Sequence, residues 1–454
     1  MEPANIPNNP ITAKLAAYFN SLSLHDLPSK LVNQAIVLIA DTIANGIYGS
    51  RSTEAAPVLE VMQEAGGRTE SMIWGHGVRI PAHAAALING TFIHCNEMDD
   101  THRVTFVHPG SFVIPSAIAT GEKMRSSGED FLVAVIAGYE TALRIALSVS
   151  PEHRFRGYHP TPTAGVFGAA IAAALLLKLD VNQTVSALGL AGSHAAGLFQ
   201  FVYDGSMVKR IHPGRSAQSG VLSALFASRG LTGPLQILEG NYGFGKVMSD
   251  RFSEETITDQ LGSYWHMMDV GIKPYSACRF CHASIDGALE IRLQPGFNPD
   301  AVDSIEIVGS HQLNIQTGNQ KPKTVLGAQF STPFMVALAL YYGDALPEDV
   351  QKGLSDPHIT GLAQKISVVV DPELPKTSRE IRMKVKMSGG EFKNAHVTLP
   401  TGEPEKPLSS SRLYEKFQML SAPALGDARA QALYEVLSRI AEIGDITAVT
   451  QEMA

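Results

Sequence analysis

The chain of 454 residues lacks the features that mark several classes of protein. Only three cysteines are present, too few for a disulfide framework, which favours a reducing compartment such as the cytoplasm. Lysine and arginine total 36 against 44 acidic residues, and the formal charge of -8 argues against binding to nucleic acid or to an anionic membrane. Any anionic ligand must therefore be bound by a local cluster of basic residues.

Targeting segments and long apolar runs are also scarce. The opening stretch "MEPANIPNNPITAKLAAYF" contains Glu2 and several prolines but no arginine, so it is typical of neither a signal peptide nor a transit peptide. The most apolar stretch runs from Ala164 for about a dozen residues before Lys178, whereas a bilayer span needs roughly 20. We expect a buried core helix there, and no membrane partner.

Several catalytic and metal motifs are missing as well. The sequence has no P-loop, no GxGxxG after a strand, no GxSxG and no HExxH, so nucleotide, dinucleotide, serine-esterase and metalloprotease functions lack support. Cys278, Cys281 and His282, with the distant Cys95, make only a weak zinc motif because a second closely spaced ligand pair is missing. No strand is indicated before the CxxC, which disfavours redox chemistry. We predict no metal and no cofactor.

The sequence does contain two regions with contrasting residue patterns. Residues 11–265 have helical periodicity, as in 31–49 and 129–149, and small residues that let helix axes approach closely. Glycines at positions 90, 110, 165, 197, 205, 214 and 220 are expected to mark helix ends. From about residue 300, "DSIEIVGS", "KISVVVD", "REIRMKVKMS" and "EFKNAHVTLP" are short β-branched runs typical of strands, with helical segments between them.

These two residue patterns predict a mainly α protein with two domains. A large helical domain would be built from both chain ends, with 1–268 as its first part and 406–454 as helices that return to it after the linker "PTGEPEKPLSSS". A smaller inserted α+β domain would occupy 269–405.

The stretch "NEMDDTHRVTFVHPGS", residues 96–111, gathers acidic, basic and imidazole groups in one short segment. Its acids, Glu97, Asp99 and Asp100, are followed by Thr101 and Arg103 and lie upstream of His108. Asp and Thr are also common helix caps, which is the simpler interpretation of Asp100 and Thr101. That interpretation does not explain His108, which precedes Pro and Gly and is predicted in a loop, where scaffolds often hold proton-transfer groups.

Three further clusters carry basic and imidazole groups. His159, in "FRGYHPTPTAG", is predicted at a helix entrance, where backbone amides favour an anion, or it merely closes a turn. The stretch "DGSMVKRIHPGRSAQSG" places Lys209, Arg210 and His212 among glycines that let the backbone approach a ligand, unless it is a solvated basic turn. Lys273 lies beside an apolar segment. Two histidines, two lysines and several carboxylates suit proton abstraction next to a carboxylate, with cations stabilising the enediolate.

Five segments together resemble the MmgE/PrpD family, which includes 2-methylcitrate dehydratase, cis-aconitate decarboxylase and iminodisuccinate epimerase. They are "NGTFIHCNEMDDTHRVTFVHPGSFVIPSAIATGE", "GYHPTPTAGVFGAAIAAALLL", "GLFQFVYDGSMVKRIHPGRSAQSGVLSALFA", "LTGPLQILEGNYGF" and "AQFSTPFMVALAL". The resemblance covers nearly the whole chain in the same order. It implies a helical domain formed from both chain ends, an inserted α+β domain, a cleft between them, and a homodimer without metal or nucleotide.

The resemblance also implies roles for individual residues. The family's catalytic positions fall on Glu97, Asp100, Thr101, His108, His159, Lys209 and Lys273, and we expect Arg103, Arg210, His212 and Phe334 to contact the substrate. Two positions depart from the family pattern. Glu97 stands where members commonly have aspartate, and Phe334 stands where dehydratase and decarboxylase members have tyrosine, so a phenol hydroxyl is missing.

We therefore expect a cytoplasmic, cofactor-independent lyase, specifically a hydro-lyase, that acts on a small di- or tricarboxylate. His108 or His159 would be the base or the acid, and Lys209 and Lys273 would bind carboxylates. An epimerase or a decarboxylase acting on a related acid is the first alternative, because the same groups can return a proton or stabilise the charge left by CO₂. A non-catalytic binding protein on the same fold is the second, and the presence of both histidines disfavours it.

Overall fold

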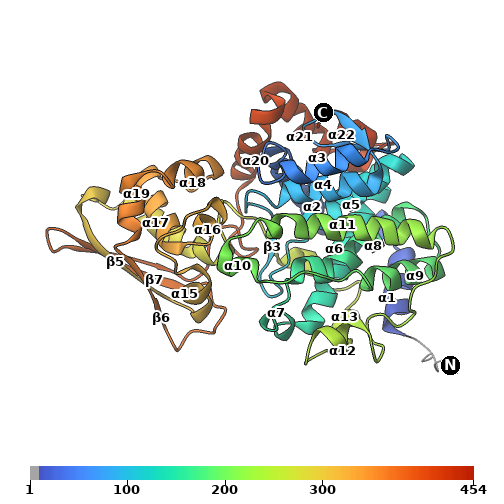
Figure 1. Ribbon diagram of the computed structural model, residues 1–454, viewed down its shortest axis with the longest axis horizontal. Coiled ribbons are helices and arrows are strands. Elements are labelled where there is room, and N and C mark those ends of the chain that lie inside the picture. Colours follow the sequence, from blue (N-terminus) through green and yellow to red (C-terminus); the bar gives the residue numbers. More distant parts are fainter. Residues whose placement is uncertain (1–9) are drawn as a thin grey trace.

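The computed structural model describes residues 10–454, which form a larger helical body and a smaller body that contains a sheet (Figure 1). Residues 1–9, on which part of the expectation about targeting peptides rests, lie outside the described residues. The protein is mainly α, as the periodicity predicts.

The larger body is built mostly of helices from the first 260 residues. These are α1 (Ile11–Asn20), α2 (Ser29–Gly49), α3 (Ala56–Ala65), α4 (Ala82–Ile93), α5 (Gly110–Met124), α6 (Gly128–Val149), α7 (Glu152–Phe155), α8 (Pro160–Leu176), α9 (Val181–Gly192), α10 (Phe201–Asp204), α11 (Val208–Ala227), α12 (Phe244–Met248) and α13 (Glu254–Thr258). Two short strand pairs accompany them, namely β1 (Ser71–Ile73) with β2 (Val78–Ile80), and β3 (Thr101–His102) with β4 (Val270–Gly271).

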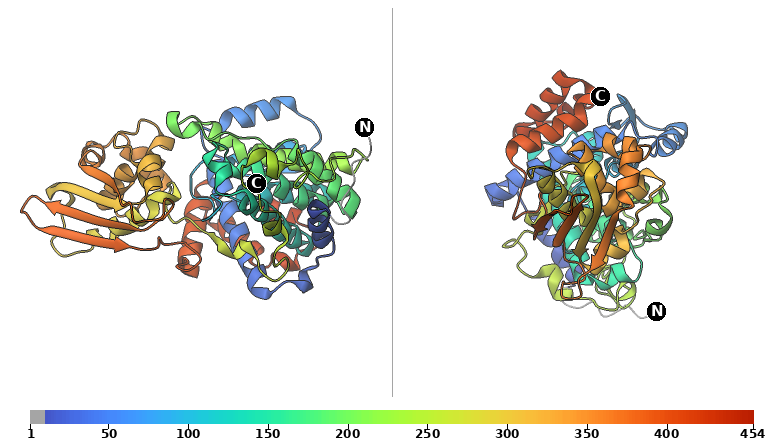
Figure 2. Two further views of the ribbon diagram at one scale, coloured as in Figure 1. Left: turned by 90° about the horizontal axis from the view of Figure 1, so that it is seen from below. Right: turned by 90° about the vertical axis from the view of Figure 1, so that its left-hand side faces the viewer.

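The core of the larger body draws on both ends of the chain. Its buried apolar residues lie between 15 and 272 and again between 417 and 453. The C-terminal helices are α20 (Ser410–Leu425), α21 (Asp427–Ser438) and α22 (Thr447–Gln451), and α20 and α21 pack against α2. Figure 2 shows these red helices beside the blue N-terminal ones. The boundaries 268/269 and 405/406 between independently folding units stay a prediction.

Helix α8 contains the most apolar stretch of the sequence and lies at the centre of this core, as expected. Pro160 opens it at a position where a missing N–H costs nothing, and almost every side chain along it is buried. Gly165 and Gly168 face Phe112 and Gly138, so α5 and α6 approach α8 closely.

Four of the glycines expected at helix ends instead lie inside helices. They are Gly90 in α4, Gly165 in α8, and Gly214 and Gly220 in α11. A Cβ atom on Gly90 would lie 2.7 Å from the Cα of Gly214, where α4 crosses α11. The prediction is wrong because contacts between helices, rather than turns, require the missing side chain there.

The sequence expectation concerned only the most apolar stretch, and longer apolar helices are present elsewhere in the chain. Helices α2 and α6, with 21 and 22 residues, are long and apolar enough to cross a membrane by length and composition. The most apolar window of α2 is 67% buried inside the fold, and that of α6 is 89% buried. Their apolar surfaces therefore face other helices, as is typical of helices in the core of a globular fold.

The smaller body has its own apolar core between residues 275 and 397. Its helices are α14 (His282–Arg292), α15 (His311–Thr317), α16 (Val325–Gln329), α17 (Thr332–Tyr342), α18 (Pro347–Gly353) and α19 (Pro357–Ala363). Its strands are β5 (Val302–Gly309), β6 (Ile366–Val370), β7 (Ile381–Met387) and β8 (Phe392–Val397), close to the predicted runs.

These four strands form one sheet in the order β6-β5-β7-β8. β5 and β6 are parallel, and the other two pairs are antiparallel. Along β7 the buried residues alternate with exposed ones, Ile381 and Met383 facing the core and Arg382 and Lys384 facing out. One face of the sheet is therefore covered, by α14 and α17.

Candidate active site

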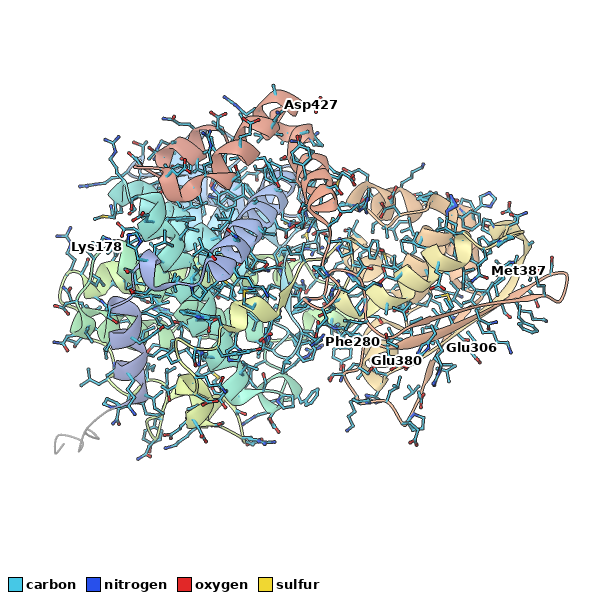
Figure 3. The ribbon with its side chains drawn as sticks, turned by 180° about the vertical axis from the view of Figure 1, so that it is seen from behind. Lys178, Phe280, Glu306, Glu380, Met387 and Asp427 are labelled. Atoms are coloured by element: carbon cyan, nitrogen blue, oxygen red, sulfur yellow. The ribbon has the colours of Figure 1, made fainter. Side chains whose placement is uncertain are left out.

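A cavity of about 490 Å³ of empty space lies where the two bodies meet. Figure 3 shows Phe280, one of its lining residues, at this junction. The larger body contributes Glu97, Thr101, Phe106, His108, Arg154, His159, Pro160, Phe199, Lys209 and Lys273. The smaller body and the segments that join it contribute Cys278, Arg279, Phe280, Gln316, Phe330 and Arg379.

The pairing of β3 with β4 brings two distant parts of the sequence to the cavity. Thr101 is opposite Gly271 and His102 is opposite Val270, so Lys273 follows directly beside the loop that contains Glu97 and His108. This loop ends where α5 begins, and His108 lies in it as predicted.

Glu97 is the centre of an ion cluster at the inner end of the cavity. Its φ of 56° is left-handed, which is uncommon for a residue other than glycine. Its side chain forms an ion pair with Lys209, lies 2.9 Å from Nη1 of Arg210, and lies 3.4 Å from Nζ of Lys273. The Nζ of Lys273 also donates to the backbone oxygen of Glu97 at 3.0 Å. One carboxylate thus organises three cations.

Burial and charge act in opposite directions on this cluster. Burial alone would raise the pKa of Glu97, but Lys209, Lys273 and Arg210 hold it well below its ordinary value. Burial lowers the pKa of Lys209, and the charge of Glu97 offsets part of that shift. Lys209 is 2% exposed and Lys273 is 0% exposed, so their ammonium groups act in surroundings with little water to screen them.

His108 is held by its Nδ1 atom. This nitrogen lies 2.8 Å from the backbone oxygen of Asp100 and 3.1 Å from Oγ1 of Thr101, which leaves Nε2 for proton exchange. Burial lowers the pKa of His108 well below its ordinary value, although the charge of Asp99 opposes the shift. The imidazole is therefore neutral at physiological pH.

His159 is the residue before the first turn of α8, the helix entrance predicted from the sequence, and its side chain makes no capping hydrogen bond. Its Nδ1 lies 2.9 Å from Nδ1 of His212, so one of these two rings donates and the other accepts. Burial, followed by the charges of His212 and Lys209, lowers the pKa of His159 well below its ordinary value. His212 itself does not line the cavity, and its contact fixes the orientation of His159.

The cavity therefore combines two neutral imidazoles with two buried ammonium groups. The imidazoles can accept or deliver a proton, and the ammonium groups can stabilise negative charge that develops on a bound carboxylate. Of the residues predicted as catalytic, the structure brings Glu97, Thr101, His108, His159, Lys209 and Lys273 to the cavity.

Asp100 lies behind the cavity wall. Its carboxyl accepts the N–H of Gly110, the first residue of α5, at 3.0 Å and the hydroxyl of Tyr139 at 2.8 Å. Burial raises its pKa to about 8, and the nearby charge of Asp99 adds to the shift. The capping interpretation thus fits Asp100, because it satisfies an N–H at the start of a helix.

Besides His212, the other three residues expected at the substrate are also placed elsewhere. Arg103 is partly exposed and pairs with Glu405, with an oxygen 2.6 Å from its Nη2. Arg210 lies behind Glu97 and does not line the cavity. Phe334 is buried in the core of the smaller body, where its ring faces Gly353, so the absence of a hydroxyl removes no contact from the cavity. Phe334 therefore packs in the hydrophobic core and does not contact the ligand cavity.

The basic segment around residues 205–220 is not a turn. Lys209, Arg210 and His212 lie in the first turns of α11, with Pro213 inside the helix. The nearby Gly214 touches Leu87 and Thr91 of α4 rather than a ligand. The glycines therefore permit packing between helices, which sets the positions of the basic side chains.

Sequence reasoning missed several cavity residues. Three are arginines from distant segments, Arg154, Arg279 and Arg379, of which only Arg279 lies in a motif, between the cysteines of the CxxC. His94, which contacts Lys209 but does not line the cavity, was missed too, and its Nδ1 lies 2.7 Å from Oδ2 of Asp99. The position of His94 in the quoted motif "NGTFIHCNEMDD" is the one signal that could have found it.

Within residues 10–454, two clusters bring enough ligand atoms together to hold a metal ion: His94 with Asp99 and His108, and His102 with His266 and Asp269. In the first, Nζ of Lys209 lies 2.9 Å from Nε2 of His94, and Nζ of Lys273 lies 3.8 Å from Oδ1 of Asp99. Two ammonium groups this close make a divalent cation unfavourable there. The cysteines of the CxxC belong to neither cluster.

Comparisons with known proteins extend over nearly the whole chain. The MmgE/PrpD N-terminal domain matches residues 13–256, and the MmgE/PrpD C-terminal domain matches residues 275–440. A cis-aconitate decarboxylase-like protein, oryM, of Aspergillus oryzae is 28% identical, and the match covers 97% of this chain and 96% of that protein. The cis-aconitate decarboxylase of Aspergillus terreus is 25% identical (96% and 94%), and that of Homo sapiens is 26% identical (97% and 94%).

Proposed function

The chain belongs to the MmgE/PrpD family, and from that premise we propose that it is a cofactor-independent lyase that removes CO₂ from a small unsaturated polycarboxylate of the cis-aconitate type. The observation that carries the proposal is the meeting of His108, His159, Lys209 and Lys273 in one cavity. Relatives named as cis-aconitate decarboxylases support decarboxylation over the dehydration that the sequence alone favoured.

The first step is binding. Lys209 and Lys273 lie on either side of Glu97, and a substrate carboxylate placed beside them exchanges water for two buried cations. Such contacts strengthen when charge grows on that carboxylate, so they lower the barrier rather than only the dissociation constant.

The second step breaks a carbon–carbon bond. Its electron pair passes into the neighbouring double bond and carboxylate as CO₂ leaves, and the two ammonium groups stabilise the resulting enediolate. His108 takes up one proton from water at its free Nε2 and passes it to carbon, so each turnover consumes one proton and releases one CO₂. His108 suits this role because its lowered pKa makes the protonated ring a strong acid, while Asp100 and Thr101 hold its other nitrogen.

The experiment is to incubate the purified protein in deuterated water with cis-aconitate, 2-methylcitrate, citrate and iminodisuccinate, and to follow each by NMR. We expect one equivalent of CO₂ from cis-aconitate and one deuteron on a carbon of the product. Loss of water from methylcitrate or citrate would instead identify a hydro-lyase. Deuterium exchange with inversion alone would identify an epimerase, and binding of these acids without turnover would identify a binding protein.

We further propose that the protein works in the cytoplasm as a homodimer, with a small carboxylic acid as its ligand. The small number of cysteines supports the cytoplasmic location, and membership of the family supports the homodimer and the acid ligand.

A further inference from the structure

Arg154 lines the cavity, and its guanidinium lies between two phenyl rings. Its Cζ atom is 4.8 Å from the ring centre of Phe106 and 4.1 Å from that of Phe199. Its Nη2 donates to Oε1 of Gln316 at 2.6 Å. Within residues 10–454, no carboxylate oxygen lies within 4.0 Å of this guanidinium. A largely buried cation thus faces the cavity without an anionic partner.

The surroundings fix the guanidinium in one orientation. Phe106 adopts a left-handed backbone, with φ 60°, in the loop between β3 and α5. The Nε2 of Gln316 lies 3.4 Å from Sγ of Cys278, which turns the amide oxygen toward Arg154. Rings hold both faces of the guanidinium and the amide holds one edge, so the remaining N–H groups keep their directions before any ligand binds. Burial lowers the pKa of Arg154 to about 10, and the group stays charged at neutral pH.

Two more arginines line the cavity and share one carboxylate. The Nε of Arg279 lies 3.0 Å from Oε1 of Glu403, and Arg379 pairs with the same oxygen. Arg279 is 4% exposed and Arg379 is 6% exposed. The Nη2 of Arg279 and the Nε of Arg379 have no hydrogen-bond partner in the part of the chain that the structure describes. Buried donors of this kind are normally satisfied.

The charges of the two sides of the cavity are unequal. Beside the histidines, three cations face three anions, namely Lys209, Lys273 and Arg210 against Glu97, Asp99 and Glu54. On the other side, the three arginines face only the buried Glu403. Unpaired buried charge is costly, so the second side is stabilised by an anion from the ligand.

We infer that Arg154, assisted by Arg279 and Arg379, binds a second carboxylate of the substrate and thereby selects polycarboxylates over monocarboxylates. The inference rests on the proposed function for the chemical class of the ligand. A planar guanidinium matches a carboxylate with two parallel hydrogen bonds, which an ammonium group cannot reproduce. The competing explanation is that Arg154 only links the two bodies by stacking.

Binding of a non-reacting acid tests this inference without relying on turnover. Tricarballylate has three carboxylates but neither a double bond nor a leaving group, and butyrate has a single carboxylate. We expect calorimetry to show tight binding of tricarballylate and much weaker binding of butyrate to the wild type. Arg154→Met keeps the apolar stem between the rings and should weaken tricarballylate binding roughly 10- to 100-fold, with little effect on butyrate.

Two further variants complete the test. Arg156→Met removes an exposed arginine that pairs with Asp250 on the surface, and its affinity should equal that of the wild type. Arg154→Lys keeps the charge and should recover part of the affinity. An equal loss of affinity for tricarballylate and for butyrate in Arg154→Met would favour the stacking role and overturn the inference, as would wild-type affinity for tricarballylate in that variant. Because tricarballylate is not turned over, these results stand even if the protein decarboxylates nothing.

Discussion

His108 combines a fixed nitrogen with a free one, which is the arrangement that a proton-transfer residue needs. Asp100 and Thr101 hold its Nδ1, and burial keeps the ring neutral. A glutamine side chain at this position can still donate to the Asp100 oxygen but cannot carry a proton to carbon. A glutamine at position 108 therefore keeps the hydrogen bond that positions the side chain but loses the proton transfer.

We predict that His108→Gln lowers kcat roughly 100- to 10,000-fold, the range of general acid–base catalysis, while KM changes little because the lysines still hold the carboxylate. Steady-state kinetics with the accepted acid checks this. His311→Gln, at an exposed position outside the cavity, is the matched control and should behave as wild type. An unchanged kcat in His108→Gln would remove this residue from the mechanism.

Asp100 gives a prediction about stability and pH. Its pKa rises from 3.8 to about 8 through burial, so between these values the folded state binds a proton that the unfolded chain has released. The free energy of unfolding therefore falls as the pH rises through this window. Asp100→Asn cannot titrate, and we expect its stability to fall less than that of the wild type between pH 5 and pH 8.

Urea unfolding at the two pH values measures this difference. Asp427→Asn, at the exposed start of α21, should retain the pH dependence of the wild type. Equal losses of stability in Asp100→Asn and wild type would show that another group causes the dependence.

At the scale of elements, the crossing of α4 and α11 sets the position of Lys209. Gly214 lies inside α11, and a Cβ atom there would come within 2.2 Å of the Leu87 oxygen and 2.6 Å of Oγ1 of Thr91. A side chain at this position would push α11 away from α4. Lys209, five residues earlier on the same helix, would then move relative to Glu97.

We predict that Gly214→Ala destabilises the protein by about 1–3 kcal/mol, the usual cost of overpacking, in spite of the higher helix propensity of alanine. Chemical denaturation measures the change. Gly361→Ala in α19 is the matched control, because no atom lies within 4 Å of its added Cβ. It should be neutral or stabilise by up to about 1 kcal/mol. Similar values for the two variants would refute the role given to the crossing.

At the scale of the whole molecule, exposed apolar side chains gather in one part of the chain. Among the described residues, 22 large hydrophobic side chains are exposed, and nine of them fall between residues 198 and 247. They are Leu198, Tyr203, Met207, Val208, Phe226, Leu231, Leu235, Tyr242 and Val247. Where such side chains lie together on the surface, they are typical of an interface.

We predict that this segment contributes to the homodimer interface. Light scattering after size exclusion should give the mass of two chains for the wild type and a lower mass for the double variant Tyr203→Glu with Tyr242→Glu. Leu293→Glu is the control, because Leu293 is 86% exposed on the smaller body. A monomeric wild type, or a double variant that stays dimeric, would contradict the prediction.

The charge pattern of the cavity also predicts independence from metal. Lys209 and Lys273 lie against His94 and Asp99, the groups that would bind an ion. Metal analysis of the purified protein should find less than one equivalent of iron or zinc, and a chelator should leave activity unchanged. Stoichiometric metal, with activity lost to a chelator and restored by the ion, would prove this wrong.

The amino-acid sequence by itself determined the elements and the identity of several cavity residues. Hydrophobic periods of 3.6 and 2 depend on local backbone geometry, and for that reason α2, α6 and strands β5–β8 fall close to where the pattern places them. The unusual chemistry of the segment from Glu97 to His108 was also visible without a structure, because polar groups seldom gather in so apolar a chain.

Only the tertiary structure decided which distant segments meet. Arg154, Arg279 and Arg379 have no shared motif, and they reach one cavity because the two bodies pack across it. Phe334 is the opposite case: the family resemblance predicted that it contacts the substrate, but the tertiary structure buries it in the core of the smaller body. Burial, pKa and charge balance depend on every neighbour in space, whereas a sequence pattern records only neighbours along the chain.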